Sequence, residues 1–358
     1  MNSDDASPRG VNWSALEALA ARLDQAGVSP GSLSDEEWSL IPAALQALTQ
    51  QADWAALLRL RRLFLGLMAR DSAGAMPALL DLSRSAAQAA EQLGDTRELA
   101  GILGAYGHNL HRQGLHRESA AALERAAALY QSLGESFEAR KNRHMTALCY
   151  RALGQRKRAR HIIQAVLEET SPTDPWRSNP LQVLGWLEQD AGDLRSARTL
   201  LEESTRLQRG TPGAEILLAG TLADLGEVHG LLGAPGVAVA CFHESLFILS
   251  GHERLYARLE ARTRVKWAEL TLRRGGLGQA LTLLDEADDL IRGLGQYYDL
   301  MWRIEMVRGF VFLRQGQWVK AWRKLRVTLT YRRALGLSAG AFARQLVGRL
   351  VQGTGLPR

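Results

Sequence analysis

Three neighbouring histidines have the residue type and the spacing that metal binding requires. His108 and His111 lie three residues apart, on one face of a predicted helix, and His116 follows nearby. No carboxylate or thiol completes a set of ligands within that helix. We therefore expect the histidines to lie on a surface of the protein, and we predict no metal site and no cofactor.

The two cysteines, Cys149 and Cys241, lie among apolar residues of predicted helices. A buried thiol keeps its proton and is a poor nucleophile, so both are expected to be inert. The chain also has no serine nucleophile elbow, Walker loop, paired metal motif or dinucleotide-binding fingerprint. We predict that the protein is not an enzyme.

Charge is distributed unevenly along the chain. The formal net charge of +6 is too small to indicate nucleic-acid binding by itself. Residues 301–358, however, contain twelve basic residues and a single acid, Glu305, so the rest of the chain is slightly acidic. Nucleic acid is therefore an alternative partner of the basic end.

Neither a targeting segment nor a membrane segment is visible in the sequence. Residues 1–10 are polar, without a basic start followed by an apolar run, which predicts no signal peptide. No window approaches the roughly 18 apolar residues that a spanning helix needs. We expect a cytoplasmic protein without a membrane partner.

Seven glycines recur at intervals of 38 to 42 residues: Gly74, Gly114, Gly154, Gly192, Gly233, Gly275 and Gly316. Around the last six, residues at fixed distances share their character. The residue seven positions before is small: Gly107, Ala147, Gly185, Gly226, Ala268 and Gly309. The residue nine positions after is large and apolar: Leu123, Ile163, Leu201, Phe242, Leu284 and Leu325. Small or short residues stand five and twelve positions after, and such agreement indicates a structural repeat.

Each of these glycines separates two amphipathic helical segments, such as Leu99–Gln113 and Arg117–Leu133. A glycine with positive φ ends the first helix without a steric penalty. The resulting helical hairpin can bury its apolar face only by stacking on the next hairpin. The sequence therefore predicts an all-α protein, a right-handed superhelical α-solenoid of antiparallel helix pairs.

One stretch, Val237–Ser250, has the composition of a β-strand, and Gly233 and Gly236 before it could be taken for a phosphate loop. Its register argues otherwise. Ala238 and Phe242 fall where the other five copies place their second helix. We predict a helix.

The registers resemble the tetratricopeptide repeat (TPR), which has small residues at its eighth, twentieth and twenty-seventh positions and glycine at its fifteenth. The resemblance covers Leu60–Leu337, although the Gly74 unit is degenerate because Leu67 replaces its small residue. The repeat here is about 40 residues rather than 34, and the usual tryptophan at the fourth position is absent. In its length it is similar to the TPR-like domains of bacterial signal-responsive transcriptional activators and peptide receptors.

We predict four segments: a polar tail at 1–10, an N-terminal helical cap at 11–59, about seven repeats at 60–337, and a C-terminal capping helix and tail at 338–358. Trp13–Gln25 and Glu36–Thr49 are the predicted helices of the first cap. Ser34, three residues before Glu37, is the candidate N-cap of the second.

The resemblance implies that the first helix of each pair lines a concave face. The residues that project onto it form a basic zone, a mixed acidic zone, and a basic zone with apolar steps. These are Arg112, Lys141, His144 and Arg151, then Trp186, Gln189, Asp224 and Glu227, then Arg262, Lys266, Glu269, Arg303, Phe310 and Arg314. This alternation suits an extended peptide of matching charge. The other interpretation is a solvated face whose arginines serve solubility.

From these features we expect a non-enzymatic adaptor or regulator that binds a peptide or protein partner in the groove. The alternative is nucleic-acid binding by the basic C-terminal surface, with a candidate patch of Arg323, Lys324, Arg326, Arg332 and Arg333. A receptor for a small signalling peptide is a third hypothesis. A homodimer formed through the end repeats also stays open.

Overall fold

A computed structural model describes residues 10–24, 34–66, 76–252, 256–292 and 298–334. Within these ranges every regular element is a helix. The chain divides into two compact units, residues 1–155 and 156–358. The predicted all-α, TPR-like arrangement of helix pairs is confirmed.

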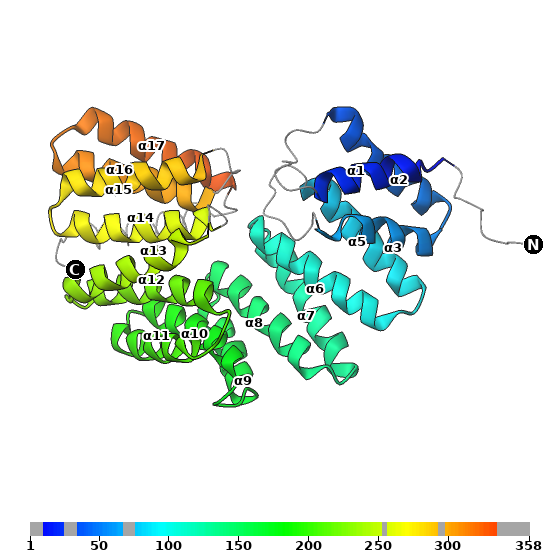
Figure 1. Cartoon of the computed structure of the whole chain (residues 1–358), viewed down its shortest axis with the longest axis horizontal. Coiled ribbons are helices and arrows are strands. Elements are labelled where there is room, and N and C mark those ends of the chain that lie inside the picture. Colours follow the sequence, from blue (N-terminus) through cyan, green and yellow to red (C-terminus); the bar gives the residue numbers. More distant parts are fainter. Residues whose placement is uncertain (1–9, 25–33, 67–75, 253–255, 293–297, 335–358) are drawn as a thin grey trace, which may run out of the picture. The chain divides into compact units, whose positions relative to one another are not determined.

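The first unit contains α1 (Trp13–Asp24), α2 (Asp35–Gln50), α3 (Trp54–Leu63), α5 (Met76–Gln92), α6 (Thr96–Arg112), α7 (His116–Ser132) and α8 (Ser136–Ala152) (Figure 1). Helix α6 packs on α7, and α7 packs on α8. The predicted cap helices correspond to α1 and α2. Ser34 forms a capping box with Glu37 at the start of α2, as expected.

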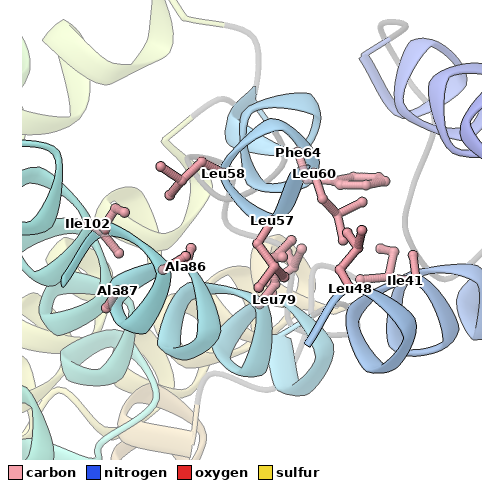
Figure 2. Close-up of a cluster of buried hydrophobic side chains, with 14 of the residues drawn as sticks. Ile41, Leu48, Leu57, Leu58, Leu60, Phe64, Leu79, Ala86, Ala87 and Ile102 are labelled. Atoms are coloured by element: carbon pink, nitrogen blue, oxygen red, sulfur yellow. The ribbon is translucent and has the colours of Figure 1, made fainter. Parts of the chain in front are cut away.

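Apolar side chains from α1, α2, α3, α5 and α6 form one core in this unit. Figure 2 shows Leu57 of α3 beside Leu79 of α5, with Leu48 on one side and Ala86 on the other. The core therefore joins the predicted cap to the first repeats. Helix α3 extends across residue 60, where the sequence predicts that the repeats begin.

The second unit contains α9 (Arg156–Glu168), α10 (Ser178–Ala191), α11 (Leu194–Arg209), α12 (Glu215–Leu231), α13 (Pro235–Ser250), α14 (Ala257–Arg273), α15 (Leu277–Ile291), α16 (Tyr298–Arg314) and α17 (Trp318–Ala334). A short 3-10 turn, Pro175–Arg177, precedes α10. Successive helices pack as antiparallel pairs, α10 with α11 through α16 with α17. The strand-like stretch forms helix α13, as its register predicts.

The turns within the pairs depend on backbone conformations that favour glycine. Gly114, Gly154, Gly192, Gly233, Gly275 and Gly316 all have φ between +73° and +90°. At Gly192 the aspartate that follows then caps the next helix, because Asp193 Oδ1 accepts a hydrogen bond from Ser196 N at 3.0 Å. Gly74 and the predicted C-terminal capping helix lie outside the described residues.

The repeated small residues let the two helices of a pair approach closely. A Cβ added at Gly226 would lie 2.8 Å from Phe242 Cε1 and 3.1 Å from the carbonyl oxygen of Ala238. Gly107, Gly185 and Gly309 make the same approach to their own second helices. The small residue five positions after each turn is fully buried in all six copies: Ser119, Ala159, Ala197, Ala238, Ala280 and Ala321. The registers found in the sequence are thus the packing contacts of the pairs.

Among the helices of the described ranges, none has the length and apolar character needed to cross a lipid bilayer.

The substitution Gly226→Val tests this packing. Its side chain would overlap the fully buried Phe242 ring, so we expect the free energy of unfolding to fall by about 1–3 kcal/mol, the usual cost of overpacking. Urea denaturation followed by circular dichroism measures the change. Gly236→Val, in the first turn of α13 with no atom within 4 Å of the added Cβ, is the matched control. Equal losses in the two variants would contradict the proposed contact.

Candidate functional site

The residues predicted for the groove lie on the first helices of the pairs. Arg112 is on α6, and Lys141, His144 and Arg151 are on α8, all within the first unit. The remainder lie on α10, α12, α14 and α16 of the second unit. In that unit α12 contacts α14, and α14 contacts α16. First helices of successive pairs therefore present a shared face, which we call the inner face of the second unit.

Acidic and basic residues of this inner face pair with one another across repeats. Lys266 Nζ of α14 lies 2.6 Å from Asp224 Oδ1 of α12 and also forms an ion pair with Glu227. Gln182 Nε2 of α10 donates a hydrogen bond to the other oxygen of Asp224 at 2.8 Å. Gln182, Asp224 and Lys266 are spaced by 42 residues, so equivalent positions of three successive repeats touch.

A second set of contacts links α14 with α16. Arg303 donates hydrogen bonds from Nη2 to both carboxylate oxygens of Glu269, at 2.9 and 3.0 Å. Arg314 Nη1 donates to the carbonyl oxygen of Leu272 at 2.6 Å, again 42 residues away. Such two-oxygen arginine–carboxylate contacts fix geometry as well as contributing energy.

Burial makes the pairing around Asp224 energetically important. Desolvation raises the pKa of Asp224, but the charges of Lys266 and Arg262 outweigh it, so the pKa lies below its ordinary value. Asp224 is therefore ionised, and both it and Lys266 are almost inaccessible to solvent. Removing one partner would leave an uncompensated buried charge.

These observations change what the sequence predicted for the charged groove. Asp224, Lys266, Glu269 and Arg303 are occupied in contacts between repeats. Phe310, expected to seat an apolar side chain, is only 2% exposed because it belongs to the core of α14–α16. When a first helix packs against the first helices on both sides, the residues in the middle of its inner face are buried. The periodicity of the sequence does not distinguish these buried residues from the accessible residues at the edge of the face.

Arg262 is a partly exposed and incompletely paired cation of the inner face. Its side chain is 32% exposed, and its guanidinium lies 3.9 Å from Asp224. Its Nε is buried and has no hydrogen-bond partner. Trp186 and Gln189 are half-buried on α10, on the helix that supplies Gln182. Arg262 on α14 and Trp186 and Gln189 on α10 are thus partly accessible residues of the inner face.

The predicted groove residues of the first unit are more open. Lys141 is exposed, lies 3.0 Å from Glu138 of its own helix, and lies 5.5 Å from the Phe137 ring centroid. Arg112, His144 and Arg151 are half-buried. The structure describes these four within the first unit, and their role in binding stays a prediction.

The candidate nucleic-acid patch is partly neutralised. Lys324 of α17 pairs with Glu305 at 2.9 Å, whereas Arg323 and Arg326 are exposed. The side chains of Arg332 and Arg333 lie outside the described residues. Arg308, which adds to the basic end of the sequence, is buried among Asp285, Asp288 and Glu305.

One cluster brings together residues that the sequence does not connect. His111 of α6, His116 of α7 and Cys149 of α8 place their nitrogen and sulfur atoms within 4.8 Å of one another. The thiol is 38 residues from His111, close to one repeat. The search for ligands within one helix missed it, and only the repeat period could have indicated it.

The fold is similar to that of solved TPR-like structures. The apo form of RapI has a TM-score of 0.61 and 13% identity, covering 79% of this chain and 99% of its own. NprR in complex with its cognate peptide NprX has a TM-score of 0.56 and 16% identity, covering 96% and 92%. A tetratricopeptide repeat protein from Parabacteroides merdae has a TM-score of 0.51 and 13% identity, covering 83% and 98%. The chain has a TPR-like fold.

These similarities concern the fold of the TPR-like chain. No protein-family model matches the sequence, and no curated protein matches it as a relative. Because the sequence identity is low, a ligand can be inferred only from the residues of the inner face and not from the shared fold.

Lys266→Met tests whether the inner-face pairs hold the repeats together. The variant leaves Asp224 buried without its nearest cation, so we expect the free energy of unfolding to fall by about 3 kcal/mol. Lys141→Met, which breaks an exposed pair within one helix, should cost less than about 1 kcal/mol. Urea denaturation of both variants makes the comparison, and a loss at Lys266 no greater than at Lys141 would refute the structural role.

Proposed function

We propose that this TPR-like protein is a non-enzymatic adaptor or regulator that binds a peptide, or an extended segment of a protein partner, on the inner face of its first helices. The observation that carries the proposal is Arg262, whose side chain is 32% exposed on the inner face and whose guanidinium lies 3.9 Å from Asp224. A carboxylate could accept hydrogen bonds from the solvent-accessible part of this guanidinium. The solved complex of NprR with NprX, which shares the fold, supports peptide as the ligand class.

Two further residues of the inner face indicate the kind of peptide. Trp186 offers an aromatic surface for an apolar side chain, and Gln189 offers an amide that can pair with peptide backbone. A peptide that combines acidic and apolar residues is therefore the expected ligand. The fixed pairs around Asp224 and Glu269 would hold the helices in place, so little ordering of the receptor accompanies binding.

A small signalling peptide and a segment of a larger partner are the two forms of this ligand. Both use the same chemistry at Arg262 and Trp186. They differ in whether a free short peptide suffices for tight binding.

The experiment uses synthetic peptides with alternating acidic and apolar residues, and basic–apolar peptides of equal length. We expect the acidic series to raise the melting temperature of the full chain and to bind in fluorescence polarisation. Arg262→Gln should weaken that binding by roughly tenfold, the value of one charged hydrogen-bond contact.

Arg274→Gln is the matched control, since Arg274 is exposed at the end of the same helix. Equal binding by wild type and Arg262→Gln, or no preference for acidic peptides, would overturn the proposal. Thermal unfolding of both variants verifies that the fold is intact.

A second candidate function is nucleic-acid binding by α17, favoured by two exposed tryptophans. Trp318 is 69% exposed and Trp322 is 67% exposed, on the helix that also carries exposed Arg323 and Arg326. Aromatic rings interleaved with cations are the components of single-strand binding surfaces.

If α17 binds single strands, Arg323→Ala with Arg326→Ala should reduce the salt dependence of binding to a labelled oligonucleotide. The slope of log affinity against log salt should fall by about 1.4, or about 0.7 for each lost phosphate contact. The double variant Arg195→Ala with Arg206→Ala, in exposed positions of α11, is the control. An unchanged slope, or release of the wild type at low salt, would exclude this function.

A further inference from the structure

A histidine–histidine–cysteine cluster lies where three successive helices of the first unit meet. His111 stands near the end of α6, His116 is the first residue of α7, and Cys149 lies in α8. The turn at Gly114, with φ of +80°, returns the chain so that both histidines lie at the same end of the hairpin. Their ring centroids are 5.0 Å apart.

The chemistry of these ligands selects a class of metal ion. Neutral imidazole and thiolate are ligands for Zn²⁺ and related transition metals, whereas Mg²⁺ and Ca²⁺ require oxygen ligands. We propose that His111, His116 and Cys149 together bind one Zn²⁺-class ion, with a fourth position available to water or an external ligand. Three protein ligands with one open position is an established zinc arrangement.

The distances are close to those of an occupied site. Zinc–nitrogen and zinc–sulfur bonds of about 2.0–2.3 Å place tetrahedral ligands roughly 3.5 Å apart. Cys149 Sγ and His111 Nδ1 are 3.4 Å apart, and all three ligand atoms lie within 4.8 Å. The ligand atom of the third residue is thus somewhat further away than in an occupied site.

The cluster contains a buried polar atom that has no hydrogen-bond partner and that a bound metal ion could satisfy. Nδ1 of His116 is buried and has no hydrogen-bond partner, an arrangement that costs free energy. Desolvation lowers the pKa of His116.

The thiol must lose a proton when the ion binds. Burial raises the pKa of Cys149 to about 11, so without metal the sulfur is protonated. Ser119 donates its hydroxyl proton to the Gly107 carbonyl at 2.6 Å. In the contact of 3.1 Å between Cys149 Sγ and Ser119 Oγ, the thiol is then the donor and the serine oxygen is the acceptor. Metal binding would replace that S–H bond by a metal–thiolate bond and release one proton to solvent.

The second cysteine provides an internal comparison. Cys241 is also buried, and desolvation also raises its pKa to about 11. Among the described residues it joins no cluster of three metal-ligating side chains. Burial alone therefore does not distinguish Cys149; the two histidines do.

The experiment is a titration of the full, tag-free chain with Co²⁺ under reducing conditions, after treatment with a chelator. We expect a thiolate-to-cobalt charge-transfer band and tetrahedral ligand-field bands that saturate at one ion per chain. Zn²⁺ should displace the cobalt and raise the melting temperature. Absence of the charge-transfer band from the wild-type protein would overturn the proposal.

Two variants and two controls assign the ligands. Cys149→Ser should abolish the charge-transfer band, and His116→Gln should weaken cobalt binding at least tenfold, with both folds verified by circular dichroism. Cys241→Ser and His161→Gln, which alter the other thiol and an exposed histidine, should bind as the wild type does. A band that persists in Cys149→Ser, or equal affinity in His116→Gln, would refute the assignment. Since His116→Gln alters a half-buried side chain at a helix end, it decides the question even if Cys149→Ser fails to fold.

Discussion

Close approach of two helices at a small residue is the contact on which this architecture depends. At Gly107, Gly185, Gly226 and Gly309 there is no room for a side chain between the helix and a large residue of its partner. Because the pairs must meet at this point, the turn length and the register of the second helix are fixed. In the two repeats with a serine twelve positions after the turn, its hydroxyl reaches the first helix: Ser204 donates to the Ser178 carbonyl at 2.8 Å and Ser245 to the Ala219 carbonyl at 2.7 Å.

The same constraint determines which residues of successive repeats touch. Since the spacing of the turns stays near 40 residues, side chains one repeat apart are brought together on adjacent first helices. Gln182, Asp224 and Lys266 form such a series, and His111 meets Cys149 in the same way. A charged or metal-ligating side chain in one repeat thereby lies next to a partner side chain in the following repeat.

Much of the fold could be predicted from the sequence, because the predictive features are local and repeated six times. The glycine with positive φ and the buried large residue recur at fixed positions in each repeat. For α13, this register predicted the helix correctly despite the strand-like composition. The state of individual polar residues could not be predicted so well. The sequence gives no measure of burial depth, so the partly exposed Arg262 and the buried Lys266, four residues apart, cannot be told apart from it. Phe310 was assigned to the groove for the same reason.

Depth also explains how one face could serve both stability and binding. Buried ion pairs contribute little net stability compared with apolar packing, but they penalise any shift that separates them. Along α12, α14 and α16 such pairs fix the positions of neighbouring helices while leaving a rim of partly solvated groups. A ligand that meets Arg262 at this rim gains a charged hydrogen bond without breaking the pair between Lys266 and Asp224. Specificity at the rim is then independent of the contacts that hold the repeats, so the peptide preference could change between related chains while the inner pairs, and the fold, stay the same.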